Sequence, residues 1–216
     1  MGLFAEFKAA LFDLDGVILD TMGAHAEAWR EAGTALNLEI DEHEIYLREG
    51  EKGEISARDF IKANGLMLTK ARVRTLLETK EKLFTSLARR PKIFPQAVEL
   101  LAACKKQGWP LALVTGTSRS EMEKIVPPEI AGMFDAAVCG DEVRHGKPNP
   151  EPYMAAASLI KLQPRDCLAV ENAPYGIQSA KTAGCRVVAV RSYLTDEDLK
   201  EAHQLVDDLA ELMSLL

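Results

Sequence analysis

The sequence predicts an α/β fold: a parallel sheet with helices on both faces, and a helical segment inserted after the first strand. Two observations support this prediction. Short, wholly apolar runs alternate with helical stretches that are bounded by glycine or proline, as in a sheet whose strands are buried on both faces. Between residues 22 and 90 the alternation stops, and the sequence shows the periodicity of successive amphipathic helices.

The strands are expected to be short and fully buried. They are predicted at residues 8–14, 111–115, 136–139, 167–170 and 187–190. The helical stretches between them include residues 95–107 and 174–183. This order of elements predicts parallel strands joined by helical crossovers.

The inserted segment is expected to form a separate helical cap. Two apolar helix faces support it: His25, Ala28, Trp29, Ala32 and Leu36 on one, and Val73, Leu76, Leu77, Leu83, Phe84 and Leu87 on the other. We therefore predict a core domain of residues 1–21 and 91–216, and a cap domain of residues 22–90. The cap would sit on two hinges over the carboxyl ends of the core strands.

Composition narrows the class of protein. With 216 residues and 47% hydrophobic residues, the chain can bury a full core, and its net charge of −7 argues against a nucleic-acid or anionic-membrane partner. No apolar stretch reaches the roughly 18 residues that a membrane span needs, and the N-terminus does not resemble a signal peptide. The four widely spaced cysteines are expected to be buried free thiols. We expect a cytoplasmic protein that is a monomer or a weak homodimer.

Polar side chains follow four of the predicted strands. Asp13 and Asp15 follow the first, Thr115 the second, Lys147 the third and Glu171 the fourth. Each has an ordinary alternative: a helix N-cap for Thr115, a solvated charge for Lys147, a surface acid for Glu171. Because ligands bind at the carboxyl ends of strands in open α/β sheets, the coincidence of all four favours an active site.

The two aspartates suggest a specific chemistry. An Asp carboxylate can attack phosphorus and form an aspartyl-phosphate, and a divalent cation offsets the repulsion of the incoming phosphate. One of the two aspartates would then be the nucleophile, and the other would transfer protons.

Four motifs occur in the order and at the spacing of a known family. They read FDLDGVILDT, LVTGTS, GKPNPEPY and ENAPYGIQSAKTAG. The sequence resembles the haloacid dehalogenase superfamily of phosphotransferases, in the branch with a helical cap after the first motif. Within that branch it is most similar to the β-phosphoglucomutase-like and related phosphatase group. The resemblance implies a Rossmann-like core.

The resemblance also implies roles for the motif residues. Asp13 is implied as nucleophile and Mg²⁺ ligand. Asp15 is implied as the acid that protonates the leaving oxygen, then as the base for the hydrolytic water, with its backbone carbonyl on the metal. Lys147 neutralises charge between Asp13 and the phosphate, and Glu171 completes the metal shell. Thr115 and the amide of Gly116 are implied to hold the phosphoryl oxygens, with Thr117 beside them.

One motif residue departs from many relatives. Asn172 stands where they carry a second acid, so it is expected to bind either the metal or the substrate. This ENAP sequence, together with an EG…G loop in the cap, resembles family members that act as inorganic pyrophosphatases.

The cap loop at residues 48–53 is expected to determine substrate specificity, with Glu49 as the candidate residue that contacts the substrate. The alternative is that this loop is only a solvated connection between two helices. Thr21 and His25 begin the cap, and either could act at the hinge or reach the site. His25 lies on an apolar face, so packing is favoured over catalysis, and substrate contact is the alternative.

The leading hypothesis is a Mg²⁺-dependent phosphohydrolase that acts on a small phosphorylated metabolite such as a sugar phosphate. The alternatives are a phosphomutase of the β-phosphoglucomutase type and an inorganic pyrophosphatase. A non-enzymatic phosphate-binding relative is the least favoured.

Overall fold

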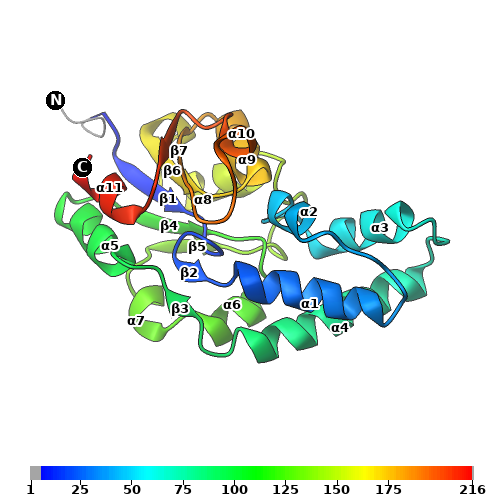
Figure 1. Ribbon diagram of the computed structural model, residues 1–216. Helices are drawn as coiled ribbons and strands as arrows, with labels where there is room; N and C mark the ends of the chain where they lie inside the picture. Colours follow the sequence, from blue (N-terminus) through cyan, green and yellow to red (C-terminus); the bar gives the residue numbers. More distant parts are fainter. Residues whose placement is uncertain (1–5, 216) are drawn as a thin grey trace.

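The computed structural model describes residues 6–215. Its centre is a six-stranded parallel sheet in the order β5-β4-β1-β6-β7-β8 (Figure 1). The strands of this sheet are β1 (Ala9–Phe12), β4 (Leu111–Val114), β5 (Ala136–Val138), β6 (Cys167–Glu171), β7 (Arg186–Val190) and β8 (Gln204–Val206). A separate antiparallel pair consists of β2 (Leu19–Asp20) and β3 (Lys92–Ile93).

The helices fall into an inserted group and a group that follows the sheet. The inserted group is α1 (Met22–Thr34), α2 (Glu42–Leu47), α3 (Gly53–Ala63) and α4 (Lys70–Leu87). The second group is α5 (Ala97–Lys106), α6 (Arg119–Ile125), α7 (Pro128–Ala131), α8 (Glu151–Leu159), the 3₁₀ turn η1 (Pro164–Asp166), α9 (Pro174–Ala183), α10 (Asp196–Leu199) and α11 (Leu209–Ser214).

The sheet separates two apolar layers, as the alternation of side chains along a strand requires. In β1, Ala10 and Phe12 point to one face and pack with α5, α6 and α11. Ala9 and Leu11 point to the other face and pack with α8 and α9. Helices therefore cover both faces, and the predicted fold is confirmed.

The prediction missed three short strands. The edge strand β8 has only three residues, and β2 and β3 have two each. Segments this short carry no readable alternation, so their pairing depends on the chain around them. In the β2–β3 pair, Leu19 lies opposite Ile93, which joins the chain just before α1 to the chain just after α4.

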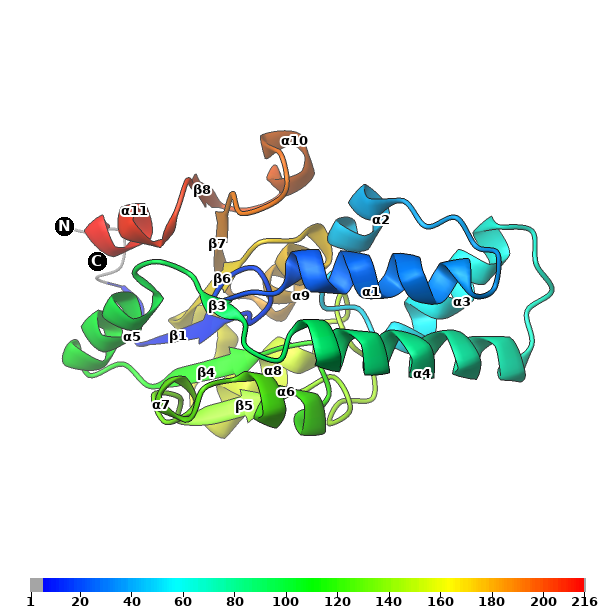
Figure 2. The ribbon, with the colours of Figure 1, turned by 60° about the horizontal axis from the view of Figure 1, so that its bottom comes forward.

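The four inserted helices lie together at one end of the sheet, with α1 and α4 side by side (Figures 1 and 2). They have an apolar cluster of their own, which includes Trp29, Phe60 and Leu76. The apolar face predicted for α4 is wrong at Leu87, which is 41% exposed. The domain boundaries at residues 22 and 90 stay a prediction, and residues 1–5 of the predicted core lie outside the described part of the chain.

The four cysteines are buried and unpaired, as expected. Burial raises the pKa of each thiol to about 12, so these thiols are protonated near neutral pH. Within residues 6–215, no helix is both long and apolar enough to cross a membrane.

Candidate active site

The candidate site lies at the carboxyl ends of neighbouring strands. Asp13 directly follows β1, Thr115 directly follows β4, and Glu171 is the last residue of β6. Lys147 comes from the connection between β5 and α8. All four side chains are buried, at 1–3% exposure. Parallel pairing of β1 with both β4 and β6 brings these residues together from distant parts of the sequence.

Lys147 links the predicted nucleophile to the fourth motif. Its Nζ donates to Asp13 Oδ1 at 2.5 Å and to Glu171 Oε1 at 2.7 Å. Burial lowers the pKa of Lys147, but the charges of the two carboxylates outweigh burial and raise it above the ordinary value. Burial also raises the pKa of Asp13 well above its usual range, although Lys147 opposes this shift. The ammonium is therefore the fixed positive charge of the site.

Glu171 is held by two further donors. The hydroxyl of Tyr153 donates to its Oε1 at 2.5 Å, and the backbone N–H of Asn172 donates to its Oε2 at 3.1 Å. Both oxygens therefore have partners in the protein. In this structure Glu171 orients Lys147, and its implied role as a metal ligand stays a prediction.

Asp15 is surrounded by threonine hydroxyls. Thr21 donates to its Oδ1 at 2.6 Å, and Thr115 and Thr117 each donate to its Oδ2 at 3.1 Å. His25 Nε2 lies 3.3 Å from Oδ1. Burial alone would raise the pKa of Asp15, but the contacts with His25, Thr21 and Thr117 hold it well below its usual range. Asp15 is therefore a carboxylate in this structure.

Gly16 allows Asn172 to approach the first motif. Its φ of +86° lies in the left-handed region, and a Cβ there would lie only 2.0 Å from Asn172 Nδ2. Asn172 Oδ1 and Asp13 Oδ2 are buried, and neither has a hydrogen-bond partner in the described part of the chain. Two buried acceptors without donors fit a divalent cation that prefers oxygen ligands, such as Mg²⁺.

A cavity of about 230 Å³ lies between the inserted helices and the strand ends. His25, Glu49, Lys80, Gly116 and Thr117 are among its lining residues. Glu49 and its neighbours in residues 48–53, the cap loop, therefore face the site. The predicted place of the cap loop is supported, while substrate contact by Glu49 stays a prediction.

The cap loop is fastened to the core. Lys52 Nζ donates to the carbonyl of Val143 at 2.5 Å, and Glu51 forms an isolated β-bridge with Lys147. Arg48 Nη1 donates to Glu51 Oε2 at 3.0 Å and to Asp59 Oδ2 at 3.1 Å. Arg48 therefore holds the loop in place and is paired with carboxylates. The alternative of a solvated connector is wrong for Glu49 and Gly50, which line the cavity.

The ordinary alternatives for three motif residues are also wrong. The N-cap of α6 is Ser118, whereas the Thr115 hydroxyl donates to Asp15. Lys147 and Glu171 are buried and paired with each other. The packing role expected for His25 is observed, because it stacks on Phe84 with ring centroids 3.9 Å apart; it also reaches Asp15, and its contact with substrate stays a prediction.

Sequence reasoning assigned no role to two residues of the site. Tyr153 ends the GKPNPEPY motif, and its position there could have suggested a contact. Lys80 is 8% exposed, lines the cavity, and places Nζ 4.6 Å from the ring centroid of Phe84. It lies four residues from both Leu76 and Phe84, so its place on an apolar helix face was a readable signal.

Comparison with known proteins gives consistent results. The sequence model of haloacid dehalogenase-like hydrolases matches residues 7–184. Hexitol phosphatase A of Escherichia coli is 29% identical, over 95% of this chain and 93% of that protein. The β-phosphoglucomutase of Bacillus subtilis is 29% identical, over 85% of this chain and 83% of that protein. The crystal structure of CbbY from Rhodobacter sphaeroides in complex with phosphate is 28% identical, covers 95% of this chain and 96% of its own, and has a TM-score of 0.79.

Proposed function

The chain belongs to the haloacid dehalogenase-like hydrolases, and on this basis we propose that it is a Mg²⁺-dependent phosphohydrolase of a small phosphorylated metabolite, such as a sugar phosphate. The observation that carries the proposal is the state of Asp13. One of its oxygens is held by Lys147, while the other is buried without a hydrogen-bond partner among the described residues. Burial raises the pKa of Asp13, and the positive charge of Lys147 and of a bound cation opposes this shift and favours the ionised form that attacks phosphorus.

Magnesium would be held by Asp13, the backbone carbonyl of Asp15, Asn172 and Glu171. The free oxygens of Asp13 and Asn172 support this assignment most directly. When bound, the ion supplies positive charge that offsets the charge of the phosphoryl group.

In the proposed reaction, an Asp13 oxygen attacks phosphorus, and the bond from phosphorus to the leaving oxygen breaks. Asp15 gives its proton to that oxygen. Asp15 then takes a proton from water, whose oxygen attacks the aspartyl-phosphate, releases phosphate and restores Asp13. Lys147 and the Gly116 amide hold the phosphoryl oxygens, and the Thr115 hydroxyl joins them by turning its hydrogen away from Asp15 once Asp15 is protonated.

Asp15 must carry a proton for the first of these steps, although it is ionised in the described structure. The negative charge of an arriving phosphate raises the pKa of a neighbouring carboxylate. Substrate binding would therefore prepare Asp15 to act as the acid, and departure of the leaving group would return it to the carboxylate that acts as the base.

The cavity favours a small substrate. At about 230 Å³ it is smaller than the pockets that bind drug-sized ligands, which start at about 300 Å³. The relatives named hexitol phosphatase A and β-phosphoglucomutase point to a sugar phosphate.

Inorganic pyrophosphate is the second candidate substrate. The buried ammonium of Lys80 and the small volume of the cavity favour it, because a second phosphoryl group would bring negative charge to Lys80.

The decisive measurement is Mg²⁺-dependent phosphate release from sugar phosphates, phosphoglycolate, nucleotides and pyrophosphate. One dominant organic substrate supports the leading proposal, and dominant pyrophosphate hydrolysis supports the second. Isomerisation of a sugar phosphate without net phosphate release would instead identify a phosphomutase.

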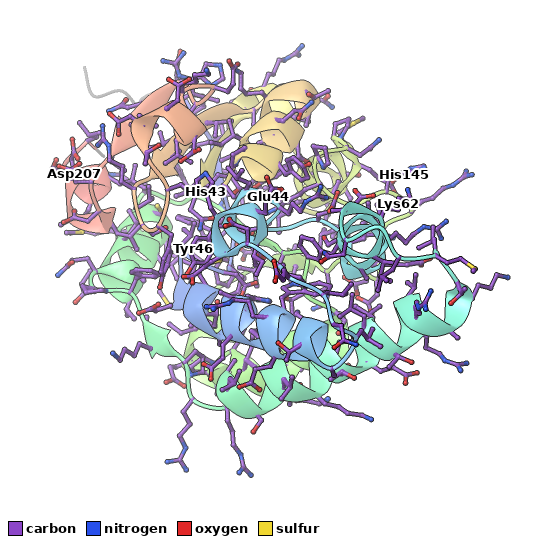
Figure 3. The ribbon with its side chains drawn as sticks, turned by 45° about the vertical axis from the view of Figure 1, so that its right-hand side comes forward. His43, Glu44, Tyr46, Lys62, His145 and Asp207 are labelled. Carbon is purple, nitrogen blue, oxygen red and sulfur yellow. The ribbon has the colours of Figure 1, made fainter. Side chains whose placement is uncertain are left out.

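Asp13→Asn tests the nucleophile on whichever substrate is turned over. We expect kcat to fall by about 10³-fold or more, since removal of a nucleophile costs at least this much in well-studied hydrolases. Asp207→Asn is the matched control, because Asp207 is an exposed carboxylate that follows the edge strand β8 and pairs with Arg191 (Figure 3). Retained turnover in Asp13→Asn would overturn the nucleophile assignment.

A further inference from the structure

Three potential metal ligands meet where the cap loop and α1 face the first strand. Asp15 comes from the loop that follows β1, His25 from α1 and Glu49 from the cap loop. One ligand atom from each lies within 4.8 Å of the other two. This trio differs from the oxygen site proposed for Mg²⁺, because it contains an imidazole nitrogen.

The environment of the His25 side chain is the first observation that points to a ligand. This side chain is 6% exposed, and Nε2 lies 3.3 Å from Asp15 Oδ1. This approach to Asp15 is too poorly aligned to count as a hydrogen bond, and Nε2 makes no other hydrogen bond among the described residues. A buried ring nitrogen that makes no well-aligned hydrogen bond leaves its bonding capacity open to a ligand.

Asp15 provides a second, independent observation. A carboxylate has about four acceptor positions. The hydroxyls of Thr21, Thr115 and Thr117 occupy three of them. The remaining position belongs to Oδ1, the oxygen that His25 Nε2 approaches.

The spacing of these two atoms fits one coordination geometry. Zinc binds imidazole nitrogen and carboxylate oxygen at about 2.0–2.2 Å in a tetrahedral arrangement, which sets two ligand atoms about 3.3–3.5 Å apart. The observed separation between Nε2 and Oδ1 is 3.3 Å. His25 and Glu49 line the cavity, so a fourth position would open toward it. Three protein ligands with one open position are the pattern of an accessible zinc site.

We propose that Asp15, His25 and Glu49 form a second metal site, selective for Zn²⁺ over Mg²⁺. The selectivity comes from the imidazole, which suits zinc and other transition metals, whereas Mg²⁺ prefers oxygen. Because His25 and Glu49 belong to the predicted cap and Asp15 to the core, bound zinc holds the two together. Zinc would also bind the carboxylate of Asp15, the proposed acid and base, so Zn²⁺ inhibits turnover. This consequence rests on the proposed function.

The test measures binding directly, on the full chain with saturating Mg²⁺. Zn²⁺ is titrated by calorimetry, and Co²⁺ serves as a probe whose visible absorption reports tetrahedral coordination. The wild type is expected to bind a single ion with a tetrahedral Co²⁺ spectrum. His25→Asn and Glu49→Gln should each weaken binding by about 10²-fold or more, because even the loss of a residue that only supports a ligand costs 10–100-fold.

His43→Asn is the matched control. His43 Nε2 also lies 3.3 Å from an aspartate oxygen, that of Asp198 on α10, but His43 itself lies at the surface on α2 (Figure 3). Its loss should leave zinc binding unchanged. Thermal unfolding of each variant shows whether it is folded, and Glu49→Gln in the cap loop provides a test that is independent of the buried His25.

Equal zinc affinity in all variants, or an octahedral Co²⁺ spectrum, would overturn the proposal. The binding readout does not depend on turnover. Zinc binding with no active substrate would contradict the proposed function alone, and turnover without zinc binding would contradict this inference alone.

Discussion

At the scale of single residues, the environment of Asp15 is the most constrained in the site. Three threonine hydroxyls from two separate segments point at one carboxylate. A carboxylate accepts from all three at once without competing donors, since it carries no hydrogen of its own when ionised. This arrangement holds the group in one orientation, as proton transfer to a fixed substrate atom requires.

Replacement of Asp15 by Asn tests this role. The variant keeps the size of the side chain but removes its proton-transfer chemistry, so we expect kcat to fall by about 10²–10⁴-fold. Steady-state phosphate release measures the effect, with Asp207→Asn as the surface control. Activity within tenfold of the wild type would mean that another group handles the proton.

Tyr153 contributes to stability through Glu171. Its fully buried hydroxyl donates to the same oxygen that Lys147 contacts. We expect Tyr153→Phe to lower the free energy of unfolding by about 1.5–3 kcal/mol, the range for a hydrogen bond to a charged group. Urea unfolding measures this loss.

Tyr46→Phe is the control for Tyr153, because Tyr46 also donates to a glutamate, Glu42, but in an exposed pair. Its effect should be much smaller, since water replaces the lost partner. Equal losses in the two variants would show that burial does not strengthen the Tyr153 contact.

At the scale of elements, the connection between α2 and α3 determines how closely the cap approaches the core. Gly50 has φ +80°, and a Cβ there would lie 2.4 Å from Lys147 Cδ. The cap loop can therefore lie this close to Lys147 only with glycine at this position. Lys52 and Glu51 fasten the same loop on either side of the contact.

Gly50→Ala and Gly65→Ala separate the effect of backbone strain from the effect of the close contact with Lys147. Both glycines have positive φ, but a Cβ at Gly65 would meet nothing within 4 Å. Each variant should lose about 1–2 kcal/mol of stability from backbone strain. Only Gly50→Ala should also lose kcat/KM, by about tenfold or more, because its methyl group displaces the cap loop. Equal activity in the two would show that the contact with Lys147 is dispensable.

At the scale of the whole molecule, His203 connects the edge of the sheet to its interior. The ring Nδ1 of His203 accepts a hydrogen bond from the backbone N–H of Val187 at 3.0 Å. The backbone N–H of His203 donates to the carbonyl of Val187, also at 3.0 Å. Only an unprotonated Nδ1 can accept the first of these bonds. Partial burial, together with the charges of Arg186 and Lys181, lowers the pKa of His203.

This lowered pKa predicts a dependence of stability on pH. The unfolded chain binds the proton more readily than the folded chain, so the stability from His203 is complete above its unfolded pKa of about 6.5 and declines as pH falls below it. His203→Asn keeps an acceptor but does not titrate in this range. Between about pH 7.5 and 5.5, the wild type should lose more unfolding free energy than the variant. Equal losses in urea unfolding at both pH values would contradict the assignment.

The sequence by itself determined the sheet, the helical insertion and the positions of the motif residues. Fully buried strands must be apolar throughout, and parallel strands place their carboxyl ends at one edge. Consequently, the grouping of Asp13, Thr115 and Glu171 could be read from the ends of apolar runs. The short strands β2, β3 and β8 could not, because two or three residues carry no pattern of their own.

Only the tertiary structure decided which atoms meet. The hydroxyl of Thr115 reaches Asp15 across 100 positions of sequence, and the ammonium of Lys147 reaches Asp13 across 134. The positions of Tyr153 and Lys80, the pairing of Arg48 with carboxylates and the approach of His25 to Asp15 all depend on contacts between separate elements. Such contacts are set by packing in three dimensions, whereas periodicity along one element shows only which face is buried.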